Sequence, residues 1–481
     1  MSLKSKIRKT AKGLLRHSPA LLHKVRQKYW KKRGEEYEQH RETIPTNPKS
    51  IIFESFMGRS YSCSPRALYE VMVDDPRFAD WDFYWSFKKG RAGIYQLPEQ
   101  YRQEPDGMPI PTEEGIRRFE EDHLTFLTTP GHTDAEIEKE AKVYEKRDYD
   151  MIRRMERAHV VVRGSDQYYQ VMPEAKFWVS NSRSPEYVSP KDDQVYIQCW
   201  HGTPLKRLGN DIQVETTAAL NTSDELAERY ELESSKWSYL VSPSHYTTEH
   251  LCSAFGMSEE DKKNKVLEIG YPRNDYMVNS MNDAEVQKAI KKHLGIPEDK
   301  KLALYAPTWR DSDYKTGVGY VFDNLIDFDE LQKMISNEWV ILFRPHYFIA
   351  NAFDFSKYEG FVYNVANVPD INDLYIIADT LITDYSSVFF DYACTGRPLM
   401  FFMPDIKDYG ENIRGFYLDP MSLPGPHTET TQELGTALQN FNDYFNEYGE
   451  AYQEFRKEFC PKEDGQAAKR LADKIAQIAG V

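Results

Sequence analysis

Short apolar runs alternate with longer amphipathic stretches along most of the chain. The length and apolar character of these runs are typical of buried strands. They occupy residues 50–56, 81–87, 159–162, 175–179, 195–199, 239–242, 265–269, 302–305, 339–343, 380–383 and 399–402. Helical or loop segments separate them. The pattern predicts an α/β fold in which parallel strands are covered by helices on both faces.

Two interruptions of this pattern divide the chain. The stretch at about 88–150 is charged and proline-bearing before it turns helical (134–158), and we interpret its first part as an irregular insertion. Residues 279–299 hold one helix and no strand, so they connect two groups of strands. We therefore predict one domain over residues 46–275 and a second over 276–429. The charged, helical stretch 430–481 is expected to pack across both domains.

Residues 377–402, IADTLITDYSSVFFDYACTGRPLMFF, form one strand-helix-strand unit with a polar turn after its first strand. Such turns lie at the carboxyl edge of a parallel sheet, where α/β folds bind ligands. Ser386 and Ser387 open a helix whose N-terminus favours phosphate, although serines there are equally suited to capping the helix. Asp384, in the same turn, could offer its carboxylate to a metal, but we expect this carboxylate to hydrogen-bond within its own turn.

The stretch WHGTPLKRLG presents His201 at the carboxyl end of the strand at 195–199. An imidazole, whose ordinary pKa lies near neutral pH, can take a proton from an attacking hydroxyl. Lys206 is positioned in sequence to meet an acidic substrate. A histidine beside a tryptophan is more often packed or hydrogen-bonded than catalytic, so both interpretations of His201 stay open at this point.

Three strands of the second domain lead into side chains that suit phosphate. These side chains are Arg310 in APTWRD, Arg344 and His346 in RPHYF, and Ser386 and Ser387 in DYSS. Arginine offers a fork of donors that matches phosphate oxygens. Each motif alone also fits a turn or a surface ion pair. Because the three follow equivalent strand ends, together they predict a pocket for a diphosphate.

Charge is distributed unevenly along the chain. The whole chain has a formal net charge of −15, yet its first 33 residues hold twelve Lys or Arg and no Asp or Glu. Apolar residues recur there at helical spacing: Leu3, Ile7, Ala11 and Leu14, then, after a break at Pro19, Leu22, Val25 and Tyr29. Residues 1–45 are thus predicted to be a basic amphipathic segment on an anionic membrane surface. The alternative is a helix that docks on the protein body with its charges solvated.

The remaining composition excludes several classes of protein. The body of the chain is acidic, so we expect no nucleic-acid partner. The five cysteines show no CxxC spacing, which argues against a zinc site or a disulfide framework. No signal peptide and no apolar run of about 18 residues is found. With the basic segment, this predicts a peripheral protein on the cytoplasmic face of the cell membrane.

Seven motifs, in order, resemble those of the CDP-glycerol glycerophosphotransferases of teichoic acid and capsule synthesis. They are FESFMGRSYS, WHGTPLK, SPSHYTTE, GYPRND, APTWRD, FRPH and ITDYSSVFFDYACTGRP, and the resemblance covers roughly residues 49–418. It implies a GT-B architecture, in which two Rossmann-like domains face each other across a cleft. It also implies transfer of glycerol phosphate, or a related alditol phosphate, from a CDP-activated donor to a hydroxyl of a lipid-linked or capsular polymer, with release of CMP.

The resemblance further implies roles for individual residues. His201 would be the catalytic base and His346 a ligand of the donor phosphate. Arg310, Ser386 and Ser387 would hold the diphosphate. The first domain would take the acceptor and the second the CDP donor, and no cofactor or metal is expected.

Two other functions share much of this pattern. A nucleotide-sugar-dependent GT-B glycosyltransferase or epimerase would have the same fold but would release UDP. A non-catalytic membrane scaffold would have no use for His201 and His346. The sequence leaves open whether the donor is CDP-glycerol or CDP-ribitol, whether one unit or a polymer is added, and what the oligomeric state is.

Overall fold

The computed structural model describes residues 19–88, 102–103, 110–111, 154, 157–212, 223–308, 314–315, 319–320, 326–345, 353–366, 368, 370–406 and 415–481. Some of the predictions fall on other residues. Arg310, His346, the first apolar stripe (residues 3–14) and nearly all of the insertion at 88–150 lie outside the described residues, as do the side chains of Leu22 and Val25.

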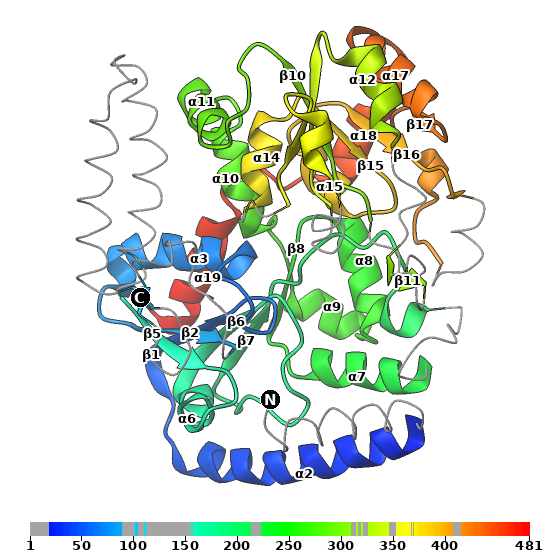
Figure 1. Ribbon diagram of the computed structural model, residues 1–481. Helices are drawn as coiled ribbons and strands as arrows, with labels where there is room; N and C mark the ends of the chain where they lie inside the picture. Colours follow the sequence, from blue (N-terminus) through cyan, green and yellow to red (C-terminus); the bar gives the residue numbers. More distant parts are fainter. Residues whose placement is uncertain are drawn as a thin grey trace.

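Seven parallel strands form the first sheet, in the lower part of Figure 1. From one edge to the other they are β5 (Ala158–Val162), β2 (Asp82–Phe87), β1 (Asn47–Glu54), β6 (Ala175–Ser180), β7 (Val195–Gln198), β8 (Tyr239–Ser242) and β9 (Val266–Glu268). The helices of this part of the chain are α3 (Cys63–Asp74), α6 (Asp166–Glu174), α7 (Ser223–Ser235), α8 (His245–Ala254) and α9 (Glu259–Lys265).

Alternation along β1 explains why this sheet is covered on both faces. Ile51 and Phe53 belong to the core cluster that includes α3, whereas Ile52 belongs to the cluster that includes α6 and α8. Successive side chains of a strand point to opposite faces. A strand with apolar residues at consecutive positions, such as 51–53, therefore needs a helical layer on each side, as the sequence predicted.

Six parallel strands form the second sheet, in the upper part of Figure 1. Their order is β14 (Val362–Asn364), β13 (Trp339–Phe343), β10 (Lys301–Tyr305), β15 (Thr380–Thr383), β16 (Leu399–Phe402) and β17 (His427–Thr428). Helices α10 (Asp275–Ser280), α11 (Ala284–His293), α12 (Phe328–Ile335), α14 (Ile371–Ile377), α15 (Val388–Ala393) and α17 (Thr431–Gln439) belong to this half. Two small antiparallel pairs, β3 (Arg102–Gln103) with β4 (Ile110–Pro111) and β11 (Tyr314–Lys315) with β12 (Gly319–Tyr320), stand apart from both sheets.

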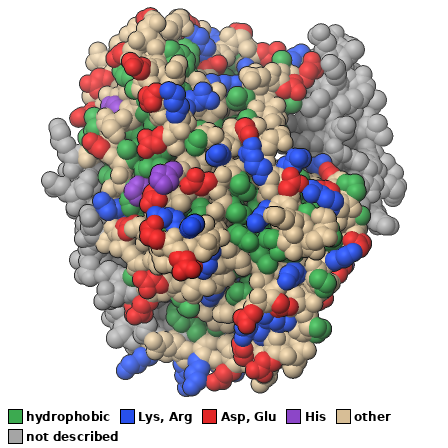
Figure 2. Space-filling view, turned by 180° about the vertical axis from the view of Figure 1, so that it is seen from behind, with side chains coloured by type: hydrophobic (Ala, Val, Ile, Leu, Met, Phe, Trp, Pro, Cys, Tyr) green, Lys and Arg blue, Asp and Glu red, His purple; other side chains and the backbone are tan. Residues whose placement is uncertain are grey.

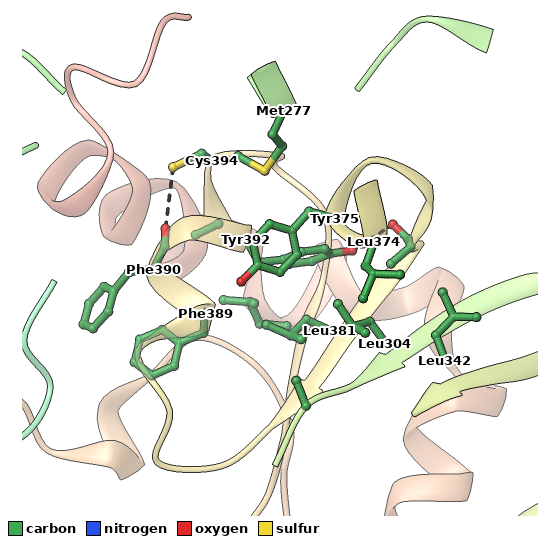
Figure 3. Packing of buried hydrophobic residues seen from close by; sticks show 14 of the residues in the cluster. Met277, Leu304, Leu342, Leu374, Tyr375, Leu381, Phe389, Phe390, Tyr392 and Cys394 are labelled. Carbon is green, nitrogen blue, oxygen red and sulfur yellow. Dashed lines mark hydrogen bonds between the residues drawn. The ribbon is translucent and has the colours of Figure 1, made fainter. Parts of the chain in front are cut away.

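The helices α14 and α15 share one face of the second sheet. Figure 3 shows Tyr375 of α14 and Phe389 of α15 packed over Leu304, Leu342 and Leu381 of the central strands. All five side chains are almost completely removed from solvent. Such dense packing leaves little room for movement. The turn before α15, which carries the two candidate serines, is thus attached to a rigid support.

The two C-terminal helices contribute to the cores of different domains, and the first of them also packs against α8 of the first domain. From α18 (Tyr444–Phe459), Phe455 and Phe459 join the core of the second domain. From α19 (Ala467–Ala479), Leu471 and Ile475 join the core of the first domain, beside α3. Figure 1 shows α19, in red, among the blue elements of the first domain. The chain therefore crosses between the domains a second time near residue 463.

Helix α2 (Pro19–Thr43) lies along the first domain, at the end away from the second sheet (Figure 1). Tyr37 is buried and its hydroxyl donates to Ser189 O at 2.9 Å, while the rings of Tyr29 and Tyr187 meet edge to face at 6.3 Å. This half of the N-terminal segment is thus docked on the protein body. Among the described helices, none has the length and apolar character needed to cross a membrane.

Charges of both signs are mixed on the described surface. Figure 2 shows acidic and basic side chains interspersed over the face seen from behind. Proteins that bind nucleic acid usually gather their basic residues into a patch or stripe. This face therefore lacks the pattern of a nucleic-acid-binding surface among its described residues.

Candidate active site

A cavity between the two domains brings together the ends of strands from both sheets. It is open to solvent and has a volume of about 380 Å³. Its lining comes from residues 200–206 and 208 after β7, residues 307–308 after β10, and residues 385–387 after β15. A molecule bound there would contact both domains at once, which is the arrangement that a transfer reaction between two substrates needs.

His201 lies on the wall that the first domain contributes. Its Nδ1 is 2.8 Å from the carbonyl oxygen of Asn181, at the end of the neighbouring strand β6. A carbonyl oxygen only accepts hydrogen bonds, so Nδ1 carries the proton and Nε2 is the nitrogen that can accept one. The arrangement fixes both the tautomer and the direction of the ring.

The surroundings of His201 favour its neutral form. One side of the residue is exposed to the cavity, but the protein around the ring removes enough water to lower the pKa of His201 below its ordinary value. The hydrogen bond to Asn181 acts in the opposite direction, and the positive charges of Arg273 and Arg183 add to the lowering. His201 is therefore ready to accept a proton at neutral pH.

Backbone strain is concentrated around this histidine. Trp200 has φ 46°, and in the loop after β1 Phe56 and Met57 have φ 47° and 58°. Residues other than glycine rarely occupy this left-handed region, and such strain is typical of functional sites. Asn181 Oδ1 accepts from Phe56 N at 2.7 Å and Ser182 Oγ accepts from Met57 N at 2.9 Å. Asn181 thus holds the strained loop with its side chain and His201 with its carbonyl.

Ser386 and Ser387 line the same cavity from the second domain. Ser387 occupies the N-cap position of α15, yet its hydroxyl makes no capping hydrogen bond. Helix capping, the alternative that the sequence left open, does not account for this residue. A Cβ placed on Gly202 would lie 3.3 Å from Ser387 Oγ, so glycine lets the loop that carries His201 come close to the serine.

Asp384 makes a contact that the sequence did not predict. Beyond the expected hydrogen bonding within its own turn, which stays a prediction, its carboxylate accepts from the backbone N–H of Thr308, at 2.9 Å and 3.1 Å for the two oxygens. The reason is topological: β10 and β15 are neighbours in the sheet, so the loops that follow them lie side by side. Asp384 therefore shapes the cavity by joining two of its walls.

The remaining candidates divide between two places. Lys206 lines the cavity, and its backbone forms a bridge with Phe416 of the second domain. Arg344 lines a different cavity and donates from Nη1 to Val365 O at 2.9 Å and Val368 O at 2.7 Å. The structure thus brings His201, Lys206, Ser386 and Ser387 together, whereas Arg344 supports a loop beside β14. Arg310 and His346 lie outside the described residues.

Sequence reasoning missed one contact at the edge of the site. Arg273, in the short 3-10 helix η5 (Pro272–Asn274), joins the backbone of His201 to Asp391 of α15. The motif GYPRND, which contains Arg273, was one of the seven family motifs, and no role was predicted for this arginine. An arginine at the boundary of two predicted domains is a candidate for a contact between them, but the sequence does not indicate its partner.

The sequence model of the family described as CDP-Glycerol:Poly(glycerophosphate) glycerophosphotransferase matches residues 132–477. The chain belongs to this family. The predicted family is thereby confirmed.

Several curated proteins are similar to this chain. A teichoic acid poly(glycerol phosphate) polymerase of Staphylococcus epidermidis is 39% identical over 429 residues, which are 89% of this chain and 50% of the relative. A polymerase with the same description from Bacillus spizizenii is 33% identical over 433 residues, or 90% and 93% of the two chains. A teichoic acid glycerol-phosphate transferase of Staphylococcus aureus is 35% identical over 430 residues, or 89% and 93%. The chain thus spans half the length of the first relative and nearly all of the other two.

A solved structure supports the fold. The structure of the wall teichoic acid polymerase TagF has a TM-score of 0.74 and 36% sequence identity, and the match covers 97% of this chain and 98% of the TagF chain. Another matching TagF structure was soaked with CDPG. The prediction of two Rossmann-like domains in a GT-B-like arrangement is confirmed.

Proposed function

We propose that this protein transfers glycerol phosphate from CDP-glycerol to a hydroxyl group of a polymeric or lipid-linked acceptor and releases CMP. The observation that carries the proposal is the cavity between the domains, which His201 lines from the first domain and Ser386 and Ser387 line from the second. A base stands on one wall and hydroxyl donors stand on the other. This arrangement suits the attack of an alcohol on a phosphate.

The side chains on the two walls of the cavity suit the following reaction. The acceptor hydroxyl attacks the phosphorus that bears glycerol, a new P–O bond forms, and the P–O bond to the CMP phosphate breaks. The proton of the hydroxyl passes to Nε2 of His201, because Nδ1 already carries a proton. Ser386 and Ser387 donate to the diphosphate oxygens, whose negative charge increases as CMP leaves. Catalysis by positioning and charge stabilisation is typical of phosphoryl transfer.

Arg310 and His346 complete the proposed donor site. Their motifs follow β10 and β13, and β10 lies between β13 and β15 in the sheet. A guanidinium and an imidazole supply the positive charge and the N–H donors that a diphosphate needs. Lys206 adds a further cation on the acceptor side of the cavity.

Glycerol is favoured over ribitol as the alditol. The relatives described as glycerol-phosphate enzymes match over about 430 residues at 33–39% identity. A relative described as a poly(ribitol-phosphate) polymerase matches over 238 residues at 31% identity. Because the likeness to the glycerol enzymes extends through both domains, CDP-glycerol is the donor that we propose.

A donor screen tests this function. Purified protein is incubated with CDP-glycerol, CDP-ribitol or a UDP-sugar in the presence of a lipid-disaccharide acceptor that carries glycerol phosphate. We expect CMP release with CDP-glycerol and little release with CDP-ribitol. UDP release from a UDP-sugar would instead identify a nucleotide-sugar transferase, and no release from any donor would favour a scaffold.

We also propose that the protein binds the cytoplasmic surface of the membrane through its basic N-terminal segment. The docked half of α2 turns Tyr37 toward the body and leaves four lysines exposed: Lys24, Lys28, Lys31 and Lys32. Docking and membrane contact are thus compatible, because one face of α2 packs on the protein body and the opposite face carries the exposed lysines. A lipid-linked acceptor would be met at this surface.

Liposome co-sedimentation tests the membrane proposal. We expect the wild-type protein to pellet with anionic vesicles and to be released by salt, since each cation near the surface contributes about 1 kcal/mol and salt screens this attraction. The fourfold change K24Q/K28Q/K31Q/K32Q should weaken binding. As a control, the exposed lysines 263, 333, 457 and 469 are changed to glutamine, which removes the same charge elsewhere. Equal binding of the two variants would contradict the proposal.

A further inference from the structure

Arg273 stands where the chain leaves the first domain. It belongs to η5 (Pro272–Asn274), between β9 of the first sheet and α10 of the second half. Its side chain is 13% exposed, and that of its partner Asp391 is 14% exposed. An ion pair this protected from water is held more firmly than a surface pair, and the loss of one partner would leave a buried charge.

One guanidinium group contacts both walls of the active site. Its Nη1 donates to the backbone carbonyl oxygen of His201. Its Nη2 lies 2.6 Å and 2.7 Å from the two carboxylate oxygens of Asp391, on α15. Ser387 is the N-cap residue of that same helix. Arg273 is therefore a direct link between the residue that carries the base and the helix that follows the serines.

Neighbouring amides keep the link in place. Asn372 Nδ2 donates to the backbone oxygen of Arg273 at 2.7 Å, and Asn274 Nδ2 donates to Asp391 at 3.3 Å. The guanidinium carbon also lies 4.7 Å from the centre of the Tyr271 ring. These contacts fix the direction of the fork, so that its two nitrogens serve different domains.

We propose that Arg273 and Asp391 are positioning residues that set the distance between His201 and the two serines and thereby couple the orientation of the domains to catalysis. The inference rests on the proposed function, since it takes His201 as the base. The pair acts through the residues it holds. A displacement of about 1 Å between reacting groups can lower a rate on the order of 100-fold.

A second ion pair between the same domains provides a matched control. Arg66 of α3 lies 3.5 Å from Asp370, the N-cap residue of α14. Among the contacts between described residues, neither Arg66 nor Asp370 meets His201 or a residue of α15. Asp370→Asn and Asp391→Asn are the same chemical change at two contacts between the domains, and only the second changes a side-chain partner of Arg273.

The test compares Asp391→Asn, Asp370→Asn and His201→Ala with the wild-type protein. For each, kcat of glycerol phosphate transfer, the Kd of CDP-glycerol and the melting temperature are measured. We expect Asp391→Asn to lower kcat on the order of 10- to 100-fold with the donor Kd changed less than about threefold. Asp370→Asn should keep kcat within about threefold of wild type. Arg273→Lys, which keeps the charge but loses the fork, should resemble Asp391→Asn.

A double variant completes the test. If the two residues act as one unit, Arg273→Gln with Asp391→Asn should lower kcat no further than the worse single change. Equal losses of kcat in Asp391→Asn and Asp370→Asn, or losses that follow the melting temperature, would overturn the inference. They would mean that Arg273 and Asp391 only stabilise the contact between the domains. A rise in donor Kd parallel to the fall in kcat would overturn the inference in favour of donor binding.

The two hypotheses fail in different ways. Normal kcat in Asp391→Asn together with an inactive His201→Ala would overturn only the positioning role. Normal kcat in His201→Ala would remove the proposed base and the positioning inference with it.

Discussion

Replacing His201 with alanine is expected to slow transfer about 10²- to 10⁴-fold, the usual contribution of a general base. Binding of CDP-glycerol should stay within a few fold of wild type, because the base contacts the acceptor hydroxyl and not the nucleotide. Single-turnover release of CMP and calorimetric titration of the donor measure the two effects separately. Near-normal turnover would exclude His201 as the base.

The pH profile adds a second readout for His201. Since burial lowers the pKa of His201 below its ordinary value, the neutral form that accepts a proton prevails at pH 7. Transfer by the wild-type protein should therefore fall only as the pH drops below about 6.5, the ordinary pKa of histidine. The residual activity of His201→Ala should lack this acidic limb. His245→Ala, at a largely exposed histidine of α8, is the control and should keep it.

Replacing Ser387 with alanine is expected to weaken the binding of CDP-glycerol. A hydrogen bond to a charged phosphate contributes about 1.5–3 kcal/mol, which corresponds to a rise in Kd of roughly 10- to 100-fold. The hydroxyl lines the cavity and is not used to cap α15, so its removal should leave the fold intact. Isothermal calorimetry with CDP-glycerol measures the change, and thermal melting verifies the fold.

Three comparisons complete this prediction. Arg310→Ala and His346→Ala should weaken donor binding by a similar amount. Ser422→Ala, at an exposed serine in the second half of the chain, should leave it unchanged. Unchanged donor affinity in Ser387→Ala, Arg310→Ala and His346→Ala alike would mean that the diphosphate binds elsewhere.

The central strands could be predicted from the sequence because they are buried on both faces. Runs such as 339–343 and 380–383 are apolar or β-branched throughout, and β13 and β15 have those bounds. The edge strands β14 and β17 were not predicted. They hold only three and two residues, too few for a pattern, and their pairing with longer neighbours defines them.

The sequence could predict those residues of the candidate site that directly follow a strand. Ser386, Ser387 and His201 were found because each follows a strand, and parallel strands end at a common edge. The partners of Asp384 and Arg344 were not predictable in the same way. Thr308 and Val365 are distant from them in sequence, and only the packed structure decides which backbone group a side chain meets.

The contacts of Arg273 could not be predicted from its sequence motif. GYPRND indicates a turn, and nothing in its spacing predicts that the guanidinium reaches an aspartate more than a hundred residues later. Contacts between domains depend on how two finished domains lie against each other. Local sequence patterns therefore carry little information about such contacts.

Because α19 supplies Leu471 and Ile475 to the core of the first domain, the order of synthesis and the order of folding differ in this chain. Domains usually fold as they leave the ribosome, the N-terminal one first. Here the first domain lacks one of its covering helices until residues 467–479 have been made. The second domain is by then complete through α18. Until then, the part of the first domain's core beside α3 lacks the side chains of α19, so this domain depends on a segment made after the second domain to reach its final state.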